Sequence, residues 1–317
     1  MKSITPKQME TSSIRIISTH EQQEQHETET RTGRTNTSTL RTETLPPLPQ
    51  PPSPENYLPP YLRLYVQHSH SDFFIASSFD PHLIAQLMYE GFLPIATRRY
   101  VVPKLHKERC VIYPLQLERT HAHTQTHSHD HPSPTLHISK NSRKRSNKFL
   151  MTMNQSFQKV VEGCHHQHGI AWLYPPIVDA FRIIHDGSVL IGDHETNSFA
   201  VRLYSVEVWN AATGELAGGE LGYAVGTIYT SLTGFAKESN AGSVQLAALG
   251  SLLWQHGFEM WDLGMKLSYK NDLGAQEMGR EEFVERVKEL RIKQMGLMQM
   301  NEKISCRSII LDCERKR

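Results

Sequence analysis

One stretch of this 317-residue chain, from Ser205 to Ala275, constrains its fold more than any other. It predicts, in order, a strand, a hairpin turn, two strands interrupted by glycines, a helix over 242–256 and a short strand over 260–262. Glycine is used where a backbone must approach a neighbour or a ligand closely. The stretch therefore predicts a mixed α/β core.

Composition narrows the class of protein. The 34 basic and 33 acidic residues give a net charge of +1, so only local clusters can carry a nucleic-acid contact. The four cysteines form no Cys-x-x-Cys pair, which favours a reducing compartment. No apolar run approaches the roughly 18 residues that span a bilayer. We expect a cytoplasmic protein without membrane contact, although organellar targeting by the N-terminal segment stays open because that segment is rich in Thr, Ser and Arg.

The order of strands and helix indicates an acyltransferase (GNAT-like) core, in which an activated acyl group binds between splayed central strands. A coenzyme A enzyme of this type would need a glycine-rich turn whose backbone N–H groups hold a pyrophosphate at the helix N-terminus. The segment over 237–243 has one glycine and the negative charge of Glu238. A coenzyme A-dependent acyltransferase therefore stays only as an alternative.

The expected fold class is α/β (α+β), with this core and a smaller N-terminal α/β domain behind a disordered arm. Shifts in composition divide the chain into five segments. They are a disordered Thr/Ser- and Pro-rich arm over 1–56, a small N-terminal domain over 57–117, a His-rich and basic insertion or linker over 118–147, a GNAT-like transferase domain over 148–295 and a loose basic tail over 296–317.

Three local patterns have two interpretations each. The prolines over 45–54 suit either a recognition ligand or a plain linker, and the linker is favoured. The histidines over 118–134 suit either zinc or nickel binding or a solvated loop, and their alternating spacing favours the loop. His165 and His168 lie one helical turn apart, but capping and surface exposure are favoured over metal binding.

A series of motifs along the chain resembles the leucyl/phenylalanyl-tRNA–protein transferase family. Single motifs are weak, but their ordered succession over more than a hundred residues is specific. The matching runs are Met88–Pro94 (Tyr-x-x-Gly-x-Phe-Pro in the family), Phe157–Cys164 (Phe-x-x-Val-Ile-x-x-Cys), Trp172 (Trp-Ile), Tyr204–Trp209 (His-Ser-Ile/Val-Glu-x-Trp), Leu216–Gly222 (Leu-Val-Gly-Gly-x-x-Gly), Asp262 (Asp-Cys-Gln) and Leu273–Ala275 (Ser-Leu-Gly-Ala).

The resemblance implies an enzyme that moves Leu or Phe from charged tRNA to the α-amino group of a protein beginning with Lys or Arg. The product would enter N-degron protein degradation. The partners implied are an aminoacyl-tRNA and a protein or peptide N-terminus, with no cofactor and no metal. We further expect a monomer.

An aminoacyl ester is already activated, so its catalyst needs mainly positioning, help with the amine proton and stabilisation of the oxyanion. Asp262, at the end of a core strand, is the catalytic candidate; its alternative role is to brace the next turn. The resemblance also implies an aminoacyl pocket. Its expected residues are Leu232, Phe235, Met260 and Gly264, whereas Leu249 is favoured as ordinary core.

The chain departs from the family pattern inside this same region. The acidic residue of the family's aminoacyl pocket falls on Leu232, and the Gln of its Asp-Cys-Gln falls on Gly264. Neither side chain donates a hydrogen bond or accepts a proton. Either neighbouring groups such as Glu238, Asp272 or Tyr269 take over, or the chain is a non-catalytic or repurposed homologue that binds tRNA or peptides.

Contact with tRNA would be electrostatic and directed mostly at phosphates. Two basic clusters are the candidates, and a solvated charged face or a nuclear-import-like patch is the alternative interpretation. The first contains Arg98, Arg99 and Lys104, with Lys107 and Arg109 nearby, and the second contains Arg143, Lys144, Arg145 and Lys148.

Overall fold

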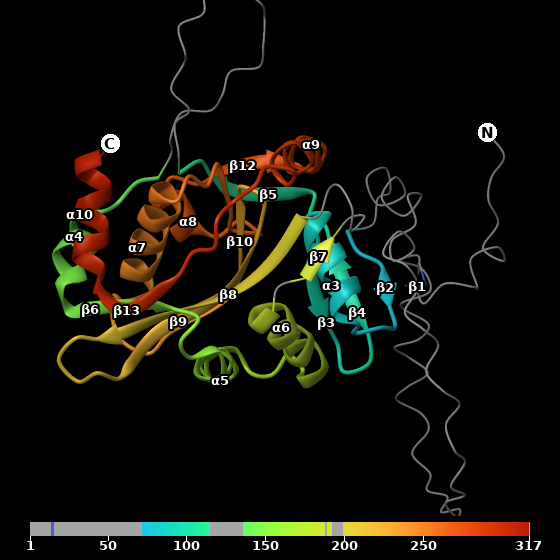
Figure 1. The fold of residues 1–317 in the computed structure, drawn as a ribbon, viewed down its shortest axis with the longest axis horizontal. Helices are drawn as coiled ribbons and strands as arrows, with labels where there is room; N and C mark the ends of the chain where they lie inside the picture. The colour runs from blue at the N-terminus through green and yellow to red at the C-terminus, as the bar shows by residue number, and fades with distance from the viewer. Residues whose placement is uncertain (1–13, 16–71, 115–135, 188, 192–198, 317) are drawn as a thin grey trace, which may run out of the picture.

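The computed structural model describes residues 14–15, 72–114, 136–187, 189–191 and 199–316, and Figure 1 traces their fold. The arm expected over 1–56 lies outside these residues, apart from strand β1 (Ile14–Arg15). The His-rich segment over 118–134 also lies outside them. Helices and sheets are mixed, in agreement with the expected α+β class.

A nine-stranded sheet forms the centre of the molecule. Its strands are β5 (Glu108–Ile112), β6 (Phe149–Met153), β7 (Val189–Ile191), β8 (Phe199–Asn210), β9 (Leu216–Val225), β10 (Ile228–Ala236), β11 (Met260–Asp262), β12 (Gln276–Gly279) and β13 (Met300–Ser305). They run in the order β12-β5-β11-β10-β9-β8-β6-β13, and β7 pairs with β8. The glycine-punctuated segment forms the antiparallel meander β8-β9-β10, as expected. β11 then pairs with β10 in parallel, so a crossover helix must connect the two.

Helices cover both faces of this sheet (Figure 1). The crossover helix α7 (Ala241–Gln255) packs with α10 (Cys306–Lys316) on one face, and α5 (Phe157–His168) and α6 (Pro175–Gly187) cover the other. The remaining helices of the large unit are α4 (Lys140–Arg145), the 3-10 turn η3 (Ser146–Lys148), α8 (Ser268–Asp272) and α9 (Arg280–Leu290).

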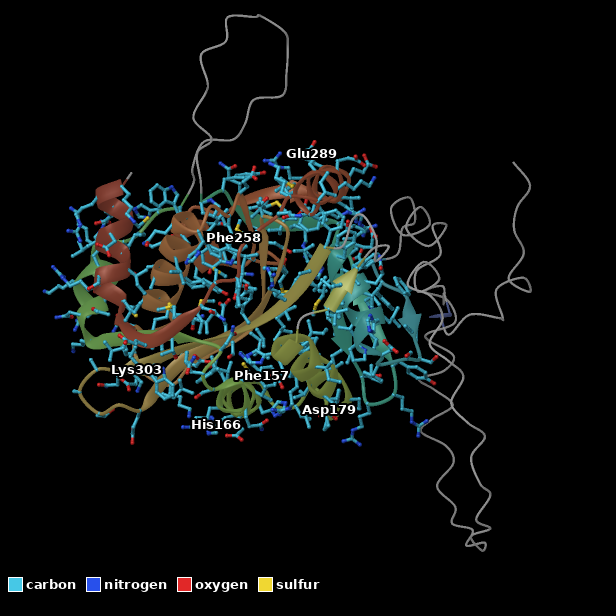
Figure 2. All side chains as sticks on the ribbon, in the orientation of Figure 1. Phe157, His166, Asp179, Phe258, Glu289 and Lys303 are labelled. Carbon is cyan, nitrogen blue, oxygen red and sulfur yellow. The ribbon has the colours of Figure 1, made fainter. Side chains whose placement is uncertain are left out.

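The sheet separates two apolar clusters. Phe157 belongs to the cluster on the α5 side and Phe258 to the cluster on the α7 side, and Figure 2 shows them on opposite sides of the central strands. Because both faces are covered, β9 is buried along nearly its whole length and reads as a continuous run of apolar and small residues. Glu220 is the exception in that run.

A smaller four-stranded sheet carries the N-terminal part, in the order β1-β2-β4-β3. Its other strands are β2 (Ile75–Ala76), β3 (Leu93–Ala96) and β4 (Val101–Lys104). The helix α3 (Pro81–Tyr89) begins after Asp80, whose side chain accepts the backbone N–H of His82 at 2.7 Å.

The boundary expected at residue 117 does not separate the two sheets. Strand β5 follows the small sheet in sequence but lies between β11 and β12 of the large one. The apolar cluster on the α5 side also runs from Phe74 to Leu290 without a break between the two sheets. The N-terminal part and the large unit therefore share one core, which local composition did not reveal.

Two further segments are more ordered than expected. The tail over 296–317 contains β13 and α10, whose Cys306, Ile309 and Ile310 pack against the α7 side of the core. The tail ends in charged residues, and these had suggested a loosely held segment rather than a helix with an apolar face. The basic linker over 140–145 is helix α4, which Ser139 caps by accepting the N–H of Ser142 at 3.0 Å. No described helix combines the length and apolar character that crossing a bilayer requires.

Candidate functional site

A pocket opens where β10 and β11 part. The two strands pair in parallel only as far as Thr230 and Asp262, after which β10 continues through a bulge at 231–233. The chain after β11 turns away over 263–267, and the two diverging segments border a cavity of about 1370 Å³. The first turns of α7, helix α8 and strand β3 also contribute to its lining. A cavity of this size has room for a small molecule or the end of a larger one.

The pocket has an apolar wall on the α5 side of the sheet. Leu232 and Phe235 of β10 line it, and both pack against the apolar cluster of that side. Gly163 of α5 makes the position of Phe235 possible, because a Cβ at residue 163 would lie 2.4 Å from the phenylalanine ring. A glycine in the middle of a helix disfavours helix formation, so close approach to this wall is its physical reason.

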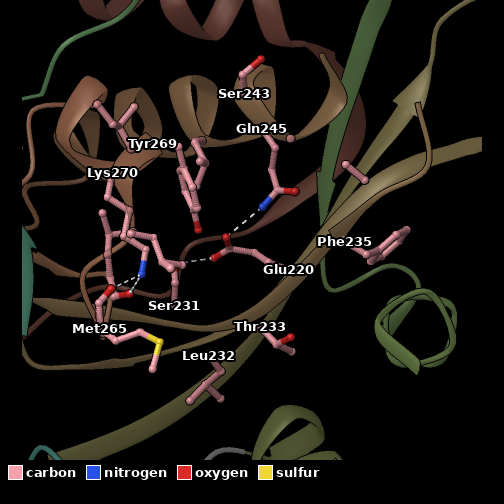
Figure 3. A pocket seen from close by; sticks show the side chains of 18 of the residues that line it. Glu220, Ser231, Leu232, Thr233, Phe235, Ser243, Gln245, Met265, Tyr269 and Lys270 are labelled. Atoms are coloured by element: carbon pink, nitrogen blue, oxygen red, sulfur yellow. Dashed lines mark hydrogen bonds between the residues drawn. The ribbon is translucent and has the colours of Figure 1, made fainter. Parts of the chain in front are cut away.

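A polar group occupies the α7 side of the same pocket. Glu220 of β9 is 3% exposed, and its Oε1 accepts hydrogen bonds from the hydroxyls of Ser231 at 2.9 Å and Tyr229 at 3.1 Å. Its Oε2 accepts the amide N–H of Gln245 of α7 at 2.8 Å (Figure 3). Gly222 leaves room for the Tyr229 hydroxyl, which a Cβ at 222 would approach to 2.2 Å.

The pocket environment changes the acidity of Glu220. Burial raises its pKa from 4.5 to about 7, while the hydrogen bonds from Ser231, Tyr229 and Gln245 act in the opposite direction. Desolvation disfavours the charged carboxylate, and the three donors favour it. The outcome is a pocket carboxylate that gains or loses a proton near neutral pH. Titratable groups matched to the working pH are common at functional sites.

The turn over 263–265 forms another wall, and a buried lysine holds it. The Nζ of Lys270 donates to the backbone oxygens of Leu263 and, at 2.6 Å, Met265. Burial lowers the pKa of Lys270. Next to it, the Tyr269 hydroxyl points toward Glu220 in Figure 3. Lys270 thus fixes this wall of the pocket by donating hydrogen bonds to two carbonyl groups of the turn.

Asp262, the catalytic candidate of the sequence, does not line the pocket. Its carboxylate is fully buried in an ion pair with both Nε, at 3.1 Å, and Nη2 of Arg109. It also accepts the backbone N–H of Gly264 at 2.8 Å and the Thr230 hydroxyl at 3.3 Å. The arrangement matches the alternative role, that of bracing the turn after β11. Direct catalysis by Asp262 stays a prediction.

The structure brings together three of the four expected pocket residues. Leu232, Phe235 and Gly264 line the cavity. Met260 is fully buried in the α5-side cluster instead, because its position in the central strand β11 points it into the core. Leu249 is also fully buried in the core.

Among the groups expected to replace the missing acidic side chain, Tyr269 and Asp272 line the pocket. Glu238 does not, and its carboxylate accepts hydrogen bonds from the Asn210 amide at 2.9 and 3.1 Å. Glu220 was missed because it falls on a variable position of the Leu-Val-Gly-Gly-x-x-Gly run. One signal was available: it is an acidic residue inside a buried, glycine-rich strand.

The first basic cluster is divided between two environments. Arg98 and Arg99 are exposed in the turn between β3 and β4, and Lys104 lines the pocket. Arg109 is buried against Asp262, with its guanidinium 4.5 Å from the centre of the Phe283 ring, so it does not belong to the cluster. His106 also lines the pocket, and burial lowers its pKa to about 4, which keeps it neutral at pH 7.

The second basic cluster surrounds α4. Lys144 and Lys148 are exposed, and Arg145 is half-buried. Arg143 forms an ion pair with Glu314 of α10, which fixes α4 to the C-terminal helix. Lys144 and Lys148 form no ion pair with any of the described residues, so their positive charges stay available on the surface.

Two of the three histidines of α5, His165 and His168, lie within hydrogen-bond distance of backbone oxygens. Nε2 of His165 lies 2.8 Å from the oxygen of Leu173, and Nε2 of His168 lies 2.7 Å from that of Gly234. Within the described residues, no group of three or more His, Cys, Asp or Glu side chains has the arrangement of a metal site. The second contact ties the end of α5 to the pocket strand β10.

Comparison with known proteins adds an independent observation. The sequence model of the leucyl/phenylalanyl-tRNA protein transferase family matches residues 131–288. Similar proteins carry the name leucyl/phenylalanyl-tRNA–protein transferase. In Proteus mirabilis the identity is 29%, over 48% of this chain and 60% of the relative. The Desulfatibacillum aliphaticivorans protein is 32% identical, over 47% of this chain and 60% of the relative. The Nitrosospira multiformis protein is 31% identical, over 49% of this chain and 62% of the relative.

The chain thus spans about 60% of the length of the curated relatives it matches. The matched region contains β8, β9, β10, α7 and β11, and with them most of the pocket. It also contains the runs at Tyr204–Trp209, Leu216–Gly222 and Leu273–Ala275 that had suggested the relationship. On these grounds, this chain belongs to the leucyl/phenylalanyl-tRNA protein transferase family.

Proposed function

We propose that this protein transfers Leu or Phe from charged tRNA to the N-terminal amine of a protein or peptide beginning with Arg or Lys. The product would enter N-degron degradation. The observation that carries the proposal is the pocket between β10 and β11, most of which falls in the segment that matches the transferase family. Its apolar wall suits the side chain of Leu or Phe, and its polar side suits the reacting groups.

The reaction itself requires little chemistry from the protein. The neutral amine of the acceptor attacks the ester carbonyl carbon, a C–N bond forms, and the bond from that carbon to the ribose oxygen breaks. One amine proton ends on the ribose oxygen of the released tRNA and the other stays on the new amide. Holding ester and amine in one pocket supplies most of the acceleration such a step needs.

The charged surface supports contact with the tRNA backbone. Arg98 and Arg99 are exposed beside β3, which borders the pocket, and Lys104 reaches the pocket lining itself. Lys144 and Lys148 are exposed near α4. Phosphate contacts of this kind fix position and orientation without reading sequence. We further propose that the protein works as a monomer in the cytoplasm.

The test is transfer of radiolabelled Leu or Phe from charged tRNA to a peptide with N-terminal Arg or Lys. The expected result is label in the peptide, with none when the peptide amine is acetylated. Charged tRNAs for other amino acids, run in parallel, define the donor. Failure of every charged tRNA to label any peptide would refute the proposal.

A second candidate follows from Leu232, which stands where the family has an acidic pocket residue. On this view the chain is a non-catalytic homologue that holds tRNA or peptide N-termini. Binding of charged tRNA or of the peptide without transfer would favour it, and robust turnover would exclude it.

A further inference from the structure

The polar side of the pocket holds a buried carboxylate, Glu220, that has no counter-ion among the described residues. All three hydrogen bonds to the Glu220 carboxylate come from neutral groups, the hydroxyls of Tyr229 and Ser231 and the amide of Gln245. No ion pair found among the described residues includes Glu220. An ionised carboxylate removed from water without an opposite charge is unfavourable.

Two buried cations of the described residues, Lys270 and Arg109, bind other groups. Lys270 acts on Glu220 only at a distance, because its Nζ donates to the backbone oxygens of Leu263 and Met265. Arg109 is paired with Asp262. Arg109 thus neutralises Asp262, whereas Glu220, which lines the pocket, has no partner cation in the part of the chain that the structure describes.

We propose that Glu220 binds a primary ammonium group of the substrate. An ammonium that enters the pocket supplies the missing positive charge and forms a charge-assisted hydrogen bond. The inference deepens the proposed function, since both substrates of that reaction carry a primary amine. It assigns Glu220 to substrate binding and does not require that it removes a proton.

The position of Glu220 has a consequence for substrate orientation. Leu232 and Phe235 face the α5 side of the sheet, whereas Glu220 faces the α7 side, where it binds Gln245 of that helix. A leucyl or phenylalanyl group fits this arrangement with its side chain on the apolar wall and its ammonium toward α7. A carboxylate on β10 at position 232 would instead face the α5 side.

Two sources offer the same ammonium chemistry, the α-amine of the aminoacyl ester and the N-terminal amine of the acceptor. Isothermal titration calorimetry with two probe pairs distinguishes them. The donor pair is leucinamide and N-acetyl-leucinamide, and the acceptor pair is a peptide with N-terminal Arg and its N-acetylated form. Each pair is titrated into the wild type, Glu220→Gln and the control Glu207→Gln.

Glu207 is the matched control because it is a buried carboxylate on the neighbouring strand β8 that does not line the pocket. It accepts hydrogen bonds from the hydroxyls of Thr152 and Ser205, both at 2.6 Å. We expect the wild type and Glu207→Gln to bind at least one free amine about tenfold more tightly than its acetylated form. Glu220→Gln should lose that preference, and the affected pair identifies the source.

The inference is overturned if the wild type has no preference for either free amine, or if Glu220→Gln keeps it. If Glu220→Gln does not fold, the inference is tested instead by the amine preference of Glu220→Asp and by the pH dependence of that preference in the wild type. The preference must survive in Glu220→Asp and must weaken in the wild type as pH falls below about 7. Lys270, Tyr269, Tyr229 and Cys164 are the other titratable groups that interact with this carboxylate.

These outcomes are independent of turnover. If no charged tRNA supports transfer but Glu220→Gln abolishes amine binding, the proposed function fails and the inference stands. If transfer proceeds at the same rate in Glu220→Gln and the amine preference is unchanged, the function stands and the inference fails.

Discussion

Asp262 and Glu220 lie on either side of β10, on the strands β11 and β9, and both carboxylates are buried. Asp262 has a cation, Arg109, and a backbone N–H, from Gly264. Among the described residues, the donors to Glu220 are all neutral, and its carboxylate lines an open pocket. A carboxylate whose charge is fully matched inside the protein holds structure, whereas one left unmatched beside a cavity is available to a ligand.

The largest effect is expected from breaking the matched pair. Asp262→Asn leaves the Arg109 charge buried and unpaired, which should lower the free energy of unfolding by about 3–5 kcal/mol. Urea denaturation measures it. The control is Asp312→Asn, whose ion pair with Arg315 is exposed and should contribute at most about 1 kcal/mol. Equal small losses in both variants would show that the Asp262 pair does not stabilise the fold.

The unmatched carboxylate should have the opposite effect on stability. The pKa of Glu220 is about 7 in the folded protein and near 4.5 when unfolded, so the folded state binds the proton more tightly. Stability from this group is present below pH 4.5 and is lost as pH rises through 7.

Glu220→Gln removes this dependence. Relative to the wild type, the variant should therefore gain on the order of 3 kcal/mol of unfolding free energy between pH 4.5 and pH 8. Urea denaturation of both proteins across that range checks it. A difference that does not change with pH, or that changes with the reverse sign, would contradict the prediction.

A smaller effect on stability is expected at the turn over 263–265, the pocket wall that Lys270 holds. Lys270→Met leaves the oxygens of Leu263 and Met265 without their buried donor, which should cost about 1–3 kcal/mol of stability. The loosened turn should also expose the Gly264 amide, so hydrogen exchange there should become faster. Lys266→Met is the control, since its ion pair with Glu277 is exposed. Unchanged exchange at Gly264 would exclude a role of Lys270 in the turn.

The smallest effect concerns the surface near the pocket. Arg98→Ala and Arg99→Ala touch neither carboxylate and should change stability by less than about 0.5 kcal/mol. If each contacts one phosphate of the tRNA, each should reduce the slope of log affinity against log salt by about 0.7–0.9. Filter binding across salt concentrations measures the slope, with Arg182→Ala on α6 as the control. Slopes equal to that of the wild type would remove these arginines from the proposed interface.

Local sequence patterns anticipated much of the fold. The hairpin between β8 and β9, helix α7 and strand β11 were all expected, and the helix and strand lie within a residue or two of their expected bounds. These features depend on residues close together in sequence, whose periodicity and turn chemistry are directly readable. The same patterns did not indicate the helix in the tail over 296–317, nor that β5 pairs with strands of the large sheet, because those neighbours are distant in the chain.

The sequence by itself determined the family, the order of elements around the pocket and three of its four expected lining residues, Leu232, Phe235 and Gly264. Only the tertiary structure decided which carboxylate faces the pocket. Arg109 neutralises Asp262 across 153 positions, and Gln245 meets Glu220 across 25. Whether a buried charge is matched depends on such distant partners, so the chemistry of each carboxylate appears only when the strands are assembled.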